Sequence, residues 1–215
     1  MLISKTKAHQ VYKTSDGRIV PGVTTVLQVL AKPALIYWAW DLGMQNIDYR
    51  KYRDKMADIG TIAHLMVLEY FKGEKYDYSE FAKSDIDKAE NCLISFFTWL
   101  KENDVKPIKV EEQFVSDYHG FGGTIDCYAM LNGIPTLLDF KTSKAIYDEM
   151  FIQVAAYKQL LQENNLEVKQ ARIIRIGRDE TEGFEDHKVT NIDDWWVIFA
   201  NALSIYKIKK RLKGK

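Results

Sequence analysis

The chain has 215 residues, 47% of them hydrophobic, and a formal net charge of zero. These values suit one domain with a sizeable core, and two cysteines are too few for a disulfide framework or a four-cysteine iron–sulfur cluster. No apolar run resembles a signal peptide or a membrane-spanning helix, so we expect a cytoplasmic protein with no membrane partner.

Positive charge is concentrated at the two ends of the chain. Nine Lys or Arg and four Asp precede Ala57, and residues 207–215 contain six Lys or Arg and no acid. The middle is therefore acidic, which fits a carboxylate metal site flanked by surfaces for a polyanion. An ordinary protein with a solvated basic tail explains the same distribution.

The first part of the chain reads as a short hairpin at residues 9–20, followed by helices. Thr24 or Thr25 is a plausible N-cap for a helix that ends near Leu30. A second helix begins at Pro33, and we expect its aromatic residues to pack in the core, although they could stack on unpaired bases. These aromatic residues are Tyr37, Trp38 and Trp40.

Residues 48–56 interleave cations with two tyrosines, which suits contact with single-stranded DNA and equally suits a solvated helix face. Residues 58–72 follow with apolar side chains at helical spacing. His64 lies in this helix, where a lone histidine is usually a satisfied core residue. Residues 84–102 read as a long scaffold helix.

A sheet is predicted to begin at residues 105–117, where Glu111 and Glu112 point to opposite faces. The glycine-rich residues 119–123 read as a turn, whose glycines permit either simple hairpin geometry or a close approach of the backbone to a substrate. Asn132-Gly133 then predicts a hairpin between two neighbouring strands.

The two strands of this hairpin contain the residues most suited to catalysis. Side chains alternate along a strand, so Asp139 and Lys141 share a face, with Phe140 on the other. In the preceding strand, Asp126 points away from the face expected for its apolar neighbours, and antiparallel pairing brings it close to Asp139. Those neighbours are Ile125, Cys127, Ala129 and Leu131.

Two close carboxylates raise each other's pKa unless a cation lies between them, and oxygen ligands suit Mg²⁺ or Mn²⁺. A lysine on the same face could orient an attacking water or stabilise a phosphate transition state. The alternative is an edge-strand salt bridge between Asp139 and Lys141 beside a solvated Asp126. Spacing alone does not separate these two interpretations.

The last third of the chain continues the α/β pattern. Residues 147–163 predict a helix on which Gln153 and Tyr157 share a face. Residues 171–177 predict a buried strand, 178–186 an acidic loop and 188–190 another strand. A final helix, capped by Asn191 or Asp193, runs from Asp194 to about Lys210 and ends in the basic tail.

Four short motifs follow one another along the chain. They are Gly60…His64, Gly123…Asp126, Asp139-x-Lys141 and Gln153…Tyr157. This ordered set resembles the PD-(D/E)xK nuclease superfamily, and in particular its RecB-type exonuclease branch, which includes phage exonucleases and the mitochondrial genome maintenance exonuclease. The resemblance covers roughly residues 20–165.

The resemblance implies a restriction-endonuclease-like α/β fold, with a mixed central β-sheet flanked by helices and an N-terminal helical region. We expect a hairpin and a mainly helical part in residues 1–105. The catalytic sheet and helix are expected in residues 106–190, and a C-terminal helix with a basic tail in residues 191–215.

The resemblance also implies roles for individual residues. The implied metal ligands, for Mg²⁺ or Mn²⁺ and without an iron–sulfur cluster, are Asp126, Asp139, the Phe140 carbonyl, His64 and Glu112, which we prefer to Glu111. The implied catalytic group is Lys141 with Asp139 and Asp126, supported by Gln153 and Tyr157. The expected DNA contacts are Thr24, Thr25, Arg50, Lys51, Arg53, Thr142, Ser143 and Lys144.

We therefore expect a divalent-metal-dependent DNA exonuclease that favours single-stranded DNA or DNA ends, acting in the host cytoplasm if it is phage-encoded. One alternative is a structure-specific or nonspecific endonuclease of the same fold. Another is a catalytically inactive nucleic-acid-binding protein that keeps the fold. A chance occurrence of the motifs is the third.

Overall fold

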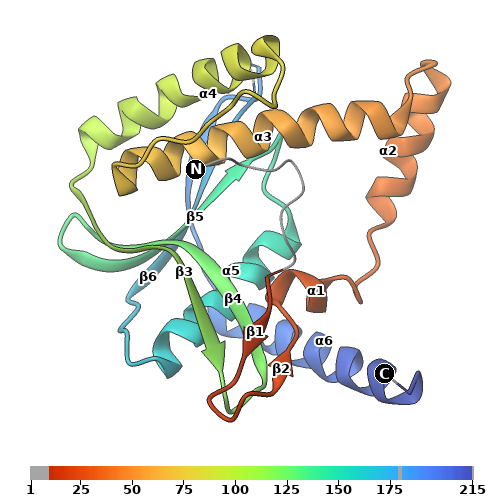
Figure 1. Ribbon diagram of the computed structural model, residues 1–215, viewed down its shortest axis with the longest axis vertical. Coiled ribbons are helices and arrows are strands. Elements are labelled where there is room, and N and C mark those ends of the chain that lie inside the picture. The colour runs from red at the N-terminus through yellow and green to blue at the C-terminus, as the bar shows by residue number, and fades with distance from the viewer. Residues whose placement is uncertain (1–9, 179–180, 215) are drawn as a thin grey trace.

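The computed structural model describes residues 10–178 and 181–214. It consists of a five-stranded mixed sheet with helices on both faces and a separate two-stranded hairpin (Figure 1). The strands are β1 Tyr12–Lys13, β2 Ile19–Val20, β3 Val105–Ser116, β4 Phe121–Leu131, β5 Ile134–Thr142, β6 Gln170–Ile176 and β7 Phe184–Lys188. The helices are α1 Val23–Leu27, α2 Pro33–Met44, α3 Tyr49–Lys72, α4 Lys83–Glu102, α5 Asp148–Glu163 and α6 Ile192–Leu212.

The five strands lie in the order β3-β4-β5-β6-β7, and all neighbours are antiparallel except β5 and β6. The β4–β5 turn is made by Asn132 and Gly133, whose φ angles of 51° and 79° fit the left-handed two-residue turn that this pair favours. A parallel pair needs a crossover, and α5 supplies it between β5 and β6. The predicted hairpin and mixed sheet are therefore both present.

Two apolar layers cover the sheet. One face packs against α1, α5 and α6 through a cluster that includes Leu137, Leu160 and Phe199. The other face packs against α3 and α4 through a cluster that includes Leu138 and Phe96. Because Leu137 and Leu138 are consecutive and lie in opposite clusters, β5 is buried on both faces, as expected for a central strand.

The helix α3 is longer than predicted, since it includes the cationic stretch before Asp58 as well as residues 58–72. The Asp48 carboxylate caps it by accepting hydrogen bonds from the backbone N–H groups of Arg50 at 2.9 Å and Lys51 at 3.2 Å. The helix ends at Gly73, whose φ of 68° is the left-handed conformation that glycine adopts easily.

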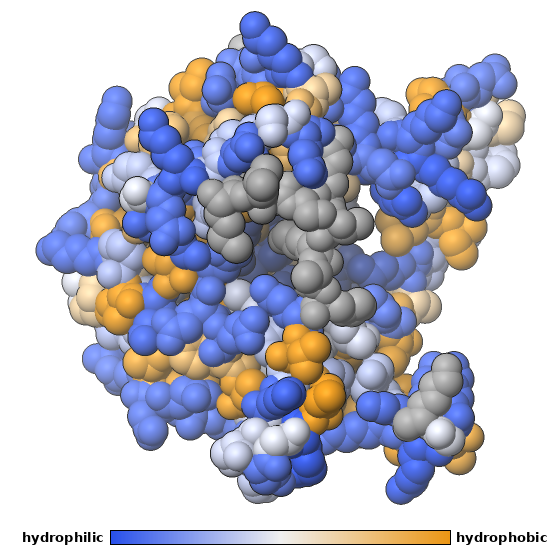
Figure 2. Space-filling model, in the orientation of Figure 1, coloured by the Kyte–Doolittle hydropathy of each residue, from blue (hydrophilic) through white to orange (hydrophobic). Residues whose placement is uncertain are grey.

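The helix α2 projects from the rest of the molecule and packs on α3, where Trp38 contacts the rings of Tyr49 and Tyr52 (Figure 1). Our expectation that its aromatic residues lie in the core is wrong for two of them, because Tyr37 is 73% exposed and Trp40 is 65% exposed. Figure 2 shows hydrophobic surface on this projecting part of the molecule.

Several predicted boundaries are wrong. Gly22, and neither Thr24 nor Thr25, occupies the N-cap position of α1. The turn before β4 is formed by residues 117–120, so Gly122 and Gly123 belong to the strand. Strand β7 begins at Phe184, inside the stretch predicted as a loop, because its acidic residues pair with arginines of β6.

The final helix begins at Ile192, two residues earlier than predicted, and Asn191 occupies its N-cap position without a side-chain cap hydrogen bond. The ends of two predicted segments, His9 of the hairpin and Lys215 of the basic tail, lie outside the described residues. No helix within residues 10–178 and 181–214 combines the length and apolar character needed to cross a membrane.

Candidate active site

The two aspartates of the predicted hairpin lie where β4 and β5 stop pairing. The ladder runs from Leu131 opposite Ile134 to Cys127 opposite Leu138. Beyond it, the Asp126 carboxylate Oδ2 accepts a hydrogen bond from the Phe140 N–H at 2.8 Å. The side chain of Asp126 therefore takes the place of a backbone partner, and its carboxylate is held beside the Asp139–Lys141 segment of β5.

At Asp126 the side chains of β4 switch to the opposite faces of the sheet, so the prediction that Ile125 and Cys127 share one face is wrong. Ile125 joins the cluster under α5, whereas Cys127 belongs with Ala129 and Leu131 to the cluster under α4. The simple alternation fails because the ladders around Asp126 are irregular. On the neighbouring strand, Glu111 has a φ of 50°, the left-handed region that a glutamate seldom adopts.

Asp139 is completely buried, and Lys141 Nζ lies 2.6 Å from its Oδ2. Oδ1 of Asp139 has no hydrogen-bond partner among the described residues. Burial raises the pKa of the Asp139 carboxyl to about 7; the Lys141 ammonium opposes this increase in pKa and the charge of Asp126 adds to it. The Asp139–Lys141 pair is therefore a buried ion pair and not the exposed edge-strand salt bridge that we considered as the alternative.

The charges of the two aspartates raise the pKa of neighbouring side chains. Burial alone would lower the pKa of Lys141, but the carboxylates of Asp139 and Asp126 together raise it above its ordinary value. Burial raises the pKa of the Tyr157 hydroxyl well above its usual range, and the same two carboxylates raise it further. Gln153 Nε2 donates a hydrogen bond to this hydroxyl at 2.7 Å. The structure thus brings the α5 motif together with the three residues of the hairpin.

Two glycines of the motifs allow this close packing. A Cβ atom on Gly123 would lie 2.6 Å from the Tyr157 ring, so only glycine lets Tyr157 lie against β4. A Cβ atom on Gly60 would lie 2.6 Å from Thr142 Oγ1 at the end of β5. We had considered close approach of the backbone to substrate for the glycines of residues 119–123, whereas the structure uses Gly123 for contact with α5.

His64 reaches the site from α3, and its Nε2 lies 3.6 Å from Asp126 Oδ1. Glu112 forms an ion pair with Lys109 at 2.9 Å, and no ion pair or hydrogen bond joins it to either aspartate within the described chain. The neighbouring Glu111 instead pairs with Lys72 of α3 at 2.7 Å. The structure therefore brings His64 to Asp126, whereas Glu112 as a metal ligand stays a prediction.

The donors present suit a hard divalent cation. Asp126 and Asp139 supply carboxylate oxygens, and Oδ1 of Asp139 is a buried acceptor without a partner, which is the kind of atom that a bound cation satisfies. Within the described part of the chain, no group of three or more His, Cys, Asp and Glu side chains is arranged to hold a metal ion. A cation here would therefore need donors beyond side chains, and the Phe140 carbonyl remains our prediction for one of them.

The predicted DNA contacts fall in three places. Arg50, Lys51 and Arg53 are exposed on the first turns of α3, and Arg53 pairs with Asp54. At the end of β5, Thr142 lies against Gly60 as described above, and after the strand Ser143 donates a hydrogen bond to the Ala145 carbonyl at 2.8 Å and Lys144 is exposed.

The third place is a cavity of about 380 Å³ between α1 and α6. Thr25 lines it, whereas Thr24 is exposed and does not. Gln28, which follows α1, also lines it, and its charged residues come from the basic end of α6; we call Lys209, Lys210 and Lys213 the α6 lysines. In the sequence, the basic tail and Thr25 were separate candidates for contact with DNA, and in the fold they line the same cavity.

Arg175 is a residue that the sequence reasoning missed. It is buried in β6, and its Nη1 donates hydrogen bonds to the carbonyls of Ser143 at 3.2 Å and Glu182 at 2.7 Å. It therefore ties the segment after Lys141 to the β6–β7 turn. A cation inside an apolar strand seldom lacks a partner, and this signal could have identified Arg175.

No protein-family model matches the chain, and no curated protein matches it either. Among solved structures, the chain is similar to a candidate exonuclease from Eubacterium rectale, with a TM-score of 0.51, 14% identity, and coverage of 73% of this chain and 68% of that one. It is also similar to an alkaline exonuclease from Laribacter hongkongensis, with a TM-score of 0.41, 9% identity, and coverage of 59% and 67%. The first similarity shows a shared fold, and the predicted fold class is confirmed.

Proposed function

We propose that the protein is a divalent-metal-dependent DNA exonuclease that acts on single-stranded DNA or DNA ends. The observation that carries this proposal is the buried Asp139, paired with Lys141 and adjacent to Asp126 where β4 and β5 separate. A buried carboxylate with a raised pKa and an unpaired oxygen is costly to keep, and such groups concentrate at functional sites. The similar solved structure from Eubacterium rectale, which is described as a candidate exonuclease, supports the same proposal.

Each residue of the site has a role in this proposal. Asp126 and Asp139 would hold Mg²⁺ or Mn²⁺, together with the Phe140 carbonyl and with His64 completing the site. When bound, the cation supplies Lewis-acid polarisation of the phosphate and lowers the pKa of a water. Lys141 positions the attacking water or stabilises the negative charge that develops on the phosphate.

Tyr157 and Gln153 position the reacting groups. The Tyr157 hydroxyl stays protonated, because burial and the two carboxylates raise its pKa, so it can act as a hydrogen-bond donor beside the aspartates. Gln153 holds the hydroxyl in place through its amide nitrogen. Because Gly123 lets the ring lie against β4, all these groups belong to one packed unit.

Two surfaces of the molecule suit a single-stranded polyanion. The α6 lysines and Thr25 offer contacts to a phosphate backbone. The exposed rings of Tyr37 and Trp40 on α2 are available for stacking on bases, and the exposed cations at the start of α3 follow them in the chain. Stacking requires unpaired bases, which is why we propose single-stranded DNA or frayed ends.

Digestion of labelled DNA tests the proposal. End-labelled single-stranded, double-stranded and circular DNA should be incubated with Mg²⁺ or Mn²⁺, with EDTA arms. We expect shortening of linear single strands from their ends, intact circles, and no reaction in EDTA. Cleavage of circles would instead identify an endonuclease, and binding without cleavage would identify an inactive nucleic-acid-binding protein.

A further inference from the structure

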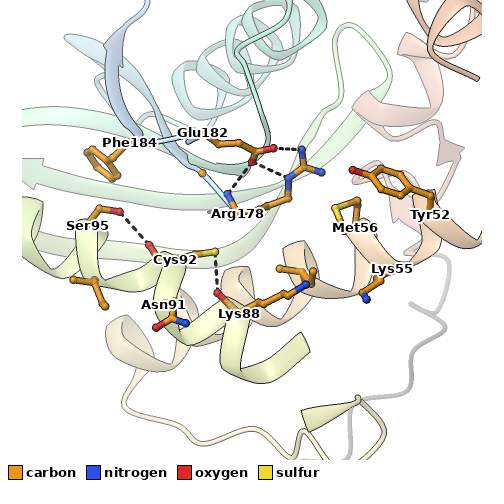
Figure 3. A pocket seen from close by; sticks show the side chains of 14 residues that line it. Tyr52, Lys55, Met56, Lys88, Asn91, Cys92, Ser95, Arg178, Glu182 and Phe184 are labelled. Atoms are coloured by element: carbon orange, nitrogen blue, oxygen red, sulfur yellow. Dashed lines mark hydrogen bonds and ion pairs between the residues drawn. The ribbon is translucent and has the colours of Figure 1, made fainter. Parts of the chain in front are cut away.

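A second and larger cavity, which we call the α3–α4 pocket, lies between α3, α4 and the β6–β7 turn (Figure 3). Its volume of about 920 Å³ is within the range of small-molecule sites. Tyr52, Lys55, Met56 and Ile59 line it from α3 at helical spacing, so they form one face of that helix. The pocket is therefore built by a continuous helix face and is not a gap between loops.

The charge of the pocket favours an anion. Lys55, Lys88 and Arg178 line it, and Glu182 is its single acidic residue within the described chain. Glu182 is already neutralised, because it accepts hydrogen bonds from Arg178 Nε at 2.9 Å and Nη2 at 2.5 Å (Figure 3). Lys55 and Lys88 are exposed and form no ion pair with another described residue, so both can contact an anionic ligand.

The remaining walls suit a flat, partly apolar group. Tyr52 and Met56 lie together at one end of the view in Figure 3, and Phe184 lies at the other. Asn91 and Ser95 of α4 add polar atoms to the lining. Aromatic and thioether side chains next to cations match the two halves of a nucleotide, which are a base and a phosphate.

The pocket is also connected to the proposed active site. On α3, Met56 precedes His64 by two turns, which corresponds to about 12 Å along the helix axis. Gly60 lies between them and contacts Thr142 at the end of β5. On the other side, Arg175 joins the Ser143 carbonyl to the Glu182 carbonyl, so the wall of the pocket is tied to the segment that follows Lys141.

We infer that the α3–α4 pocket binds a nucleotide, with the phosphate held by Lys55 and Lys88 and the base against Tyr52 and Met56. The nucleotide is either a unit of the DNA strand that occupies the active site or a free nucleotide. The first source rests on the proposed function, whereas the second does not. The two sources share one chemistry and differ in whether a DNA strand competes for the pocket.

Binding measured in EDTA tests the inference without relying on cleavage. The probes are deoxythymidine 5′-monophosphate, measured by calorimetry, and a fluorescently labelled thymidine octamer, measured by anisotropy. The test variant is Lys55→Ala with Lys88→Ala, and the control replaces Lys83 and Lys101, which are exposed on α4 outside the pocket. We expect at least a tenfold weaker affinity for the mononucleotide in the test variant and less than a twofold change in the control.

The octamer distinguishes the sources. If the pocket holds a unit of the strand, the octamer competes with the mononucleotide and binds the test variant more weakly than the wild type. If the pocket holds a free nucleotide, the octamer does not compete and its affinity for the test variant is unchanged. Mononucleotide binding that is absent from the wild type, or equal in test and control variants, would overturn the inference. A protein that binds the mononucleotide here but cleaves no DNA contradicts the proposed function and leaves the pocket assignment intact.

Discussion

Replacing Asp126 by asparagine separates the structural role of its side chain from its charge. The Phe140 N–H donates to Oδ2 at 2.8 Å, and the amide oxygen of asparagine can accept the same hydrogen bond. We therefore expect Asp126→Asn to change the free energy of unfolding by less than about 1 kcal/mol. Asp126→Ala should cost about 1–3 kcal/mol, because it leaves the Phe140 N–H without an acceptor.

Activity should respond differently from stability. Both variants remove a negative charge that the proposed cation needs, so both should lose about 3–4 kcal/mol of transition-state stabilisation, or about 10²–10³ in rate. The wild type and the two variants should be compared by urea denaturation in EDTA and by single-turnover cleavage of end-labelled single-stranded DNA. A matched control is Asp104→Asn, since Asp104 is exposed and pairs only with the exposed Lys106 in the described chain.

Two results would refute this reasoning. If Asp126→Asn cleaves DNA within tenfold of the wild-type rate, the charge of Asp126 is not required and the metal assignment is wrong. If Asp126→Ala is as stable as Asp126→Asn, the hydrogen bond to Phe140 does not hold the two strands in the described arrangement.

Gly123→Ala would place a Cβ atom 2.6 Å from Tyr157. We expect it to lower the free energy of unfolding, measured by urea denaturation, by about 1–3 kcal/mol and to slow cleavage. The control Gly43→Ala, whose Cβ atom would meet nothing within 4 Å, should have neither effect. Equal stability of the two variants would contradict the packing described for Gly123. Burial holds the pKa of Asp139 at about 7, so below pH 7 a bound proton must leave before a cation can bind. The increase in melting temperature caused by Mn²⁺ should therefore be smaller at pH 6 than at pH 8, and the opposite order would exclude Asp139 as a ligand. The logarithm of the affinity for single-stranded DNA falls linearly with the logarithm of the salt concentration. Replacing the three α6 lysines by alanine should make this slope less steep by about 2, at about 0.7 for each lost phosphate contact. An unchanged slope would remove this surface from the path of the DNA.

The hairpin that carries the site was predictable because its signals are local. Asn132-Gly133 specifies the turn, and the period of two along β5 places Asp139 and Lys141 on one face. The burial of Asp139 was not predictable from this pattern, because it depends on α5 and on the Tyr157 ring that lies against Gly123.

The predictions failed where long-range contacts override local patterns. Strand β7 was taken for an acidic loop, but Asp186 pairs with Arg172 at 2.8 Å and accepts a hydrogen bond from Trp99 Nε1 at 2.8 Å. Its acidic residues are thus partners of β6 and α4, which no window of sequence reveals. The face of Ile125 was wrong for a related reason, because the Asp126 side chain replaces a backbone partner in the ladder.

The helix α2 shows the limit of arguments from composition. Its aromatic residues have the character of a core, yet the helix packs on α3 beside the main body and leaves Tyr37 and Trp40 exposed. The positions of helices around a sheet are set by which faces are already covered. Here α3 and α4 cover one face while α1, α5 and α6 cover the other, so α2 lies outside both layers.

Cleavage of end-labelled single-stranded DNA by the wild-type protein and by Asp139→Asn, each with Mn²⁺ and with EDTA, tests the central claim most directly. The variant keeps the shape of the buried side chain and removes its charge. We predict cleavage by the wild type with Mn²⁺, and no cleavage by the wild type in EDTA or by Asp139→Asn in either condition. Cleavage by the wild type in EDTA, or by Asp139→Asn at a rate near that of the wild type, would contradict the assignment of Asp126, Asp139 and Lys141 as a divalent-metal nuclease site.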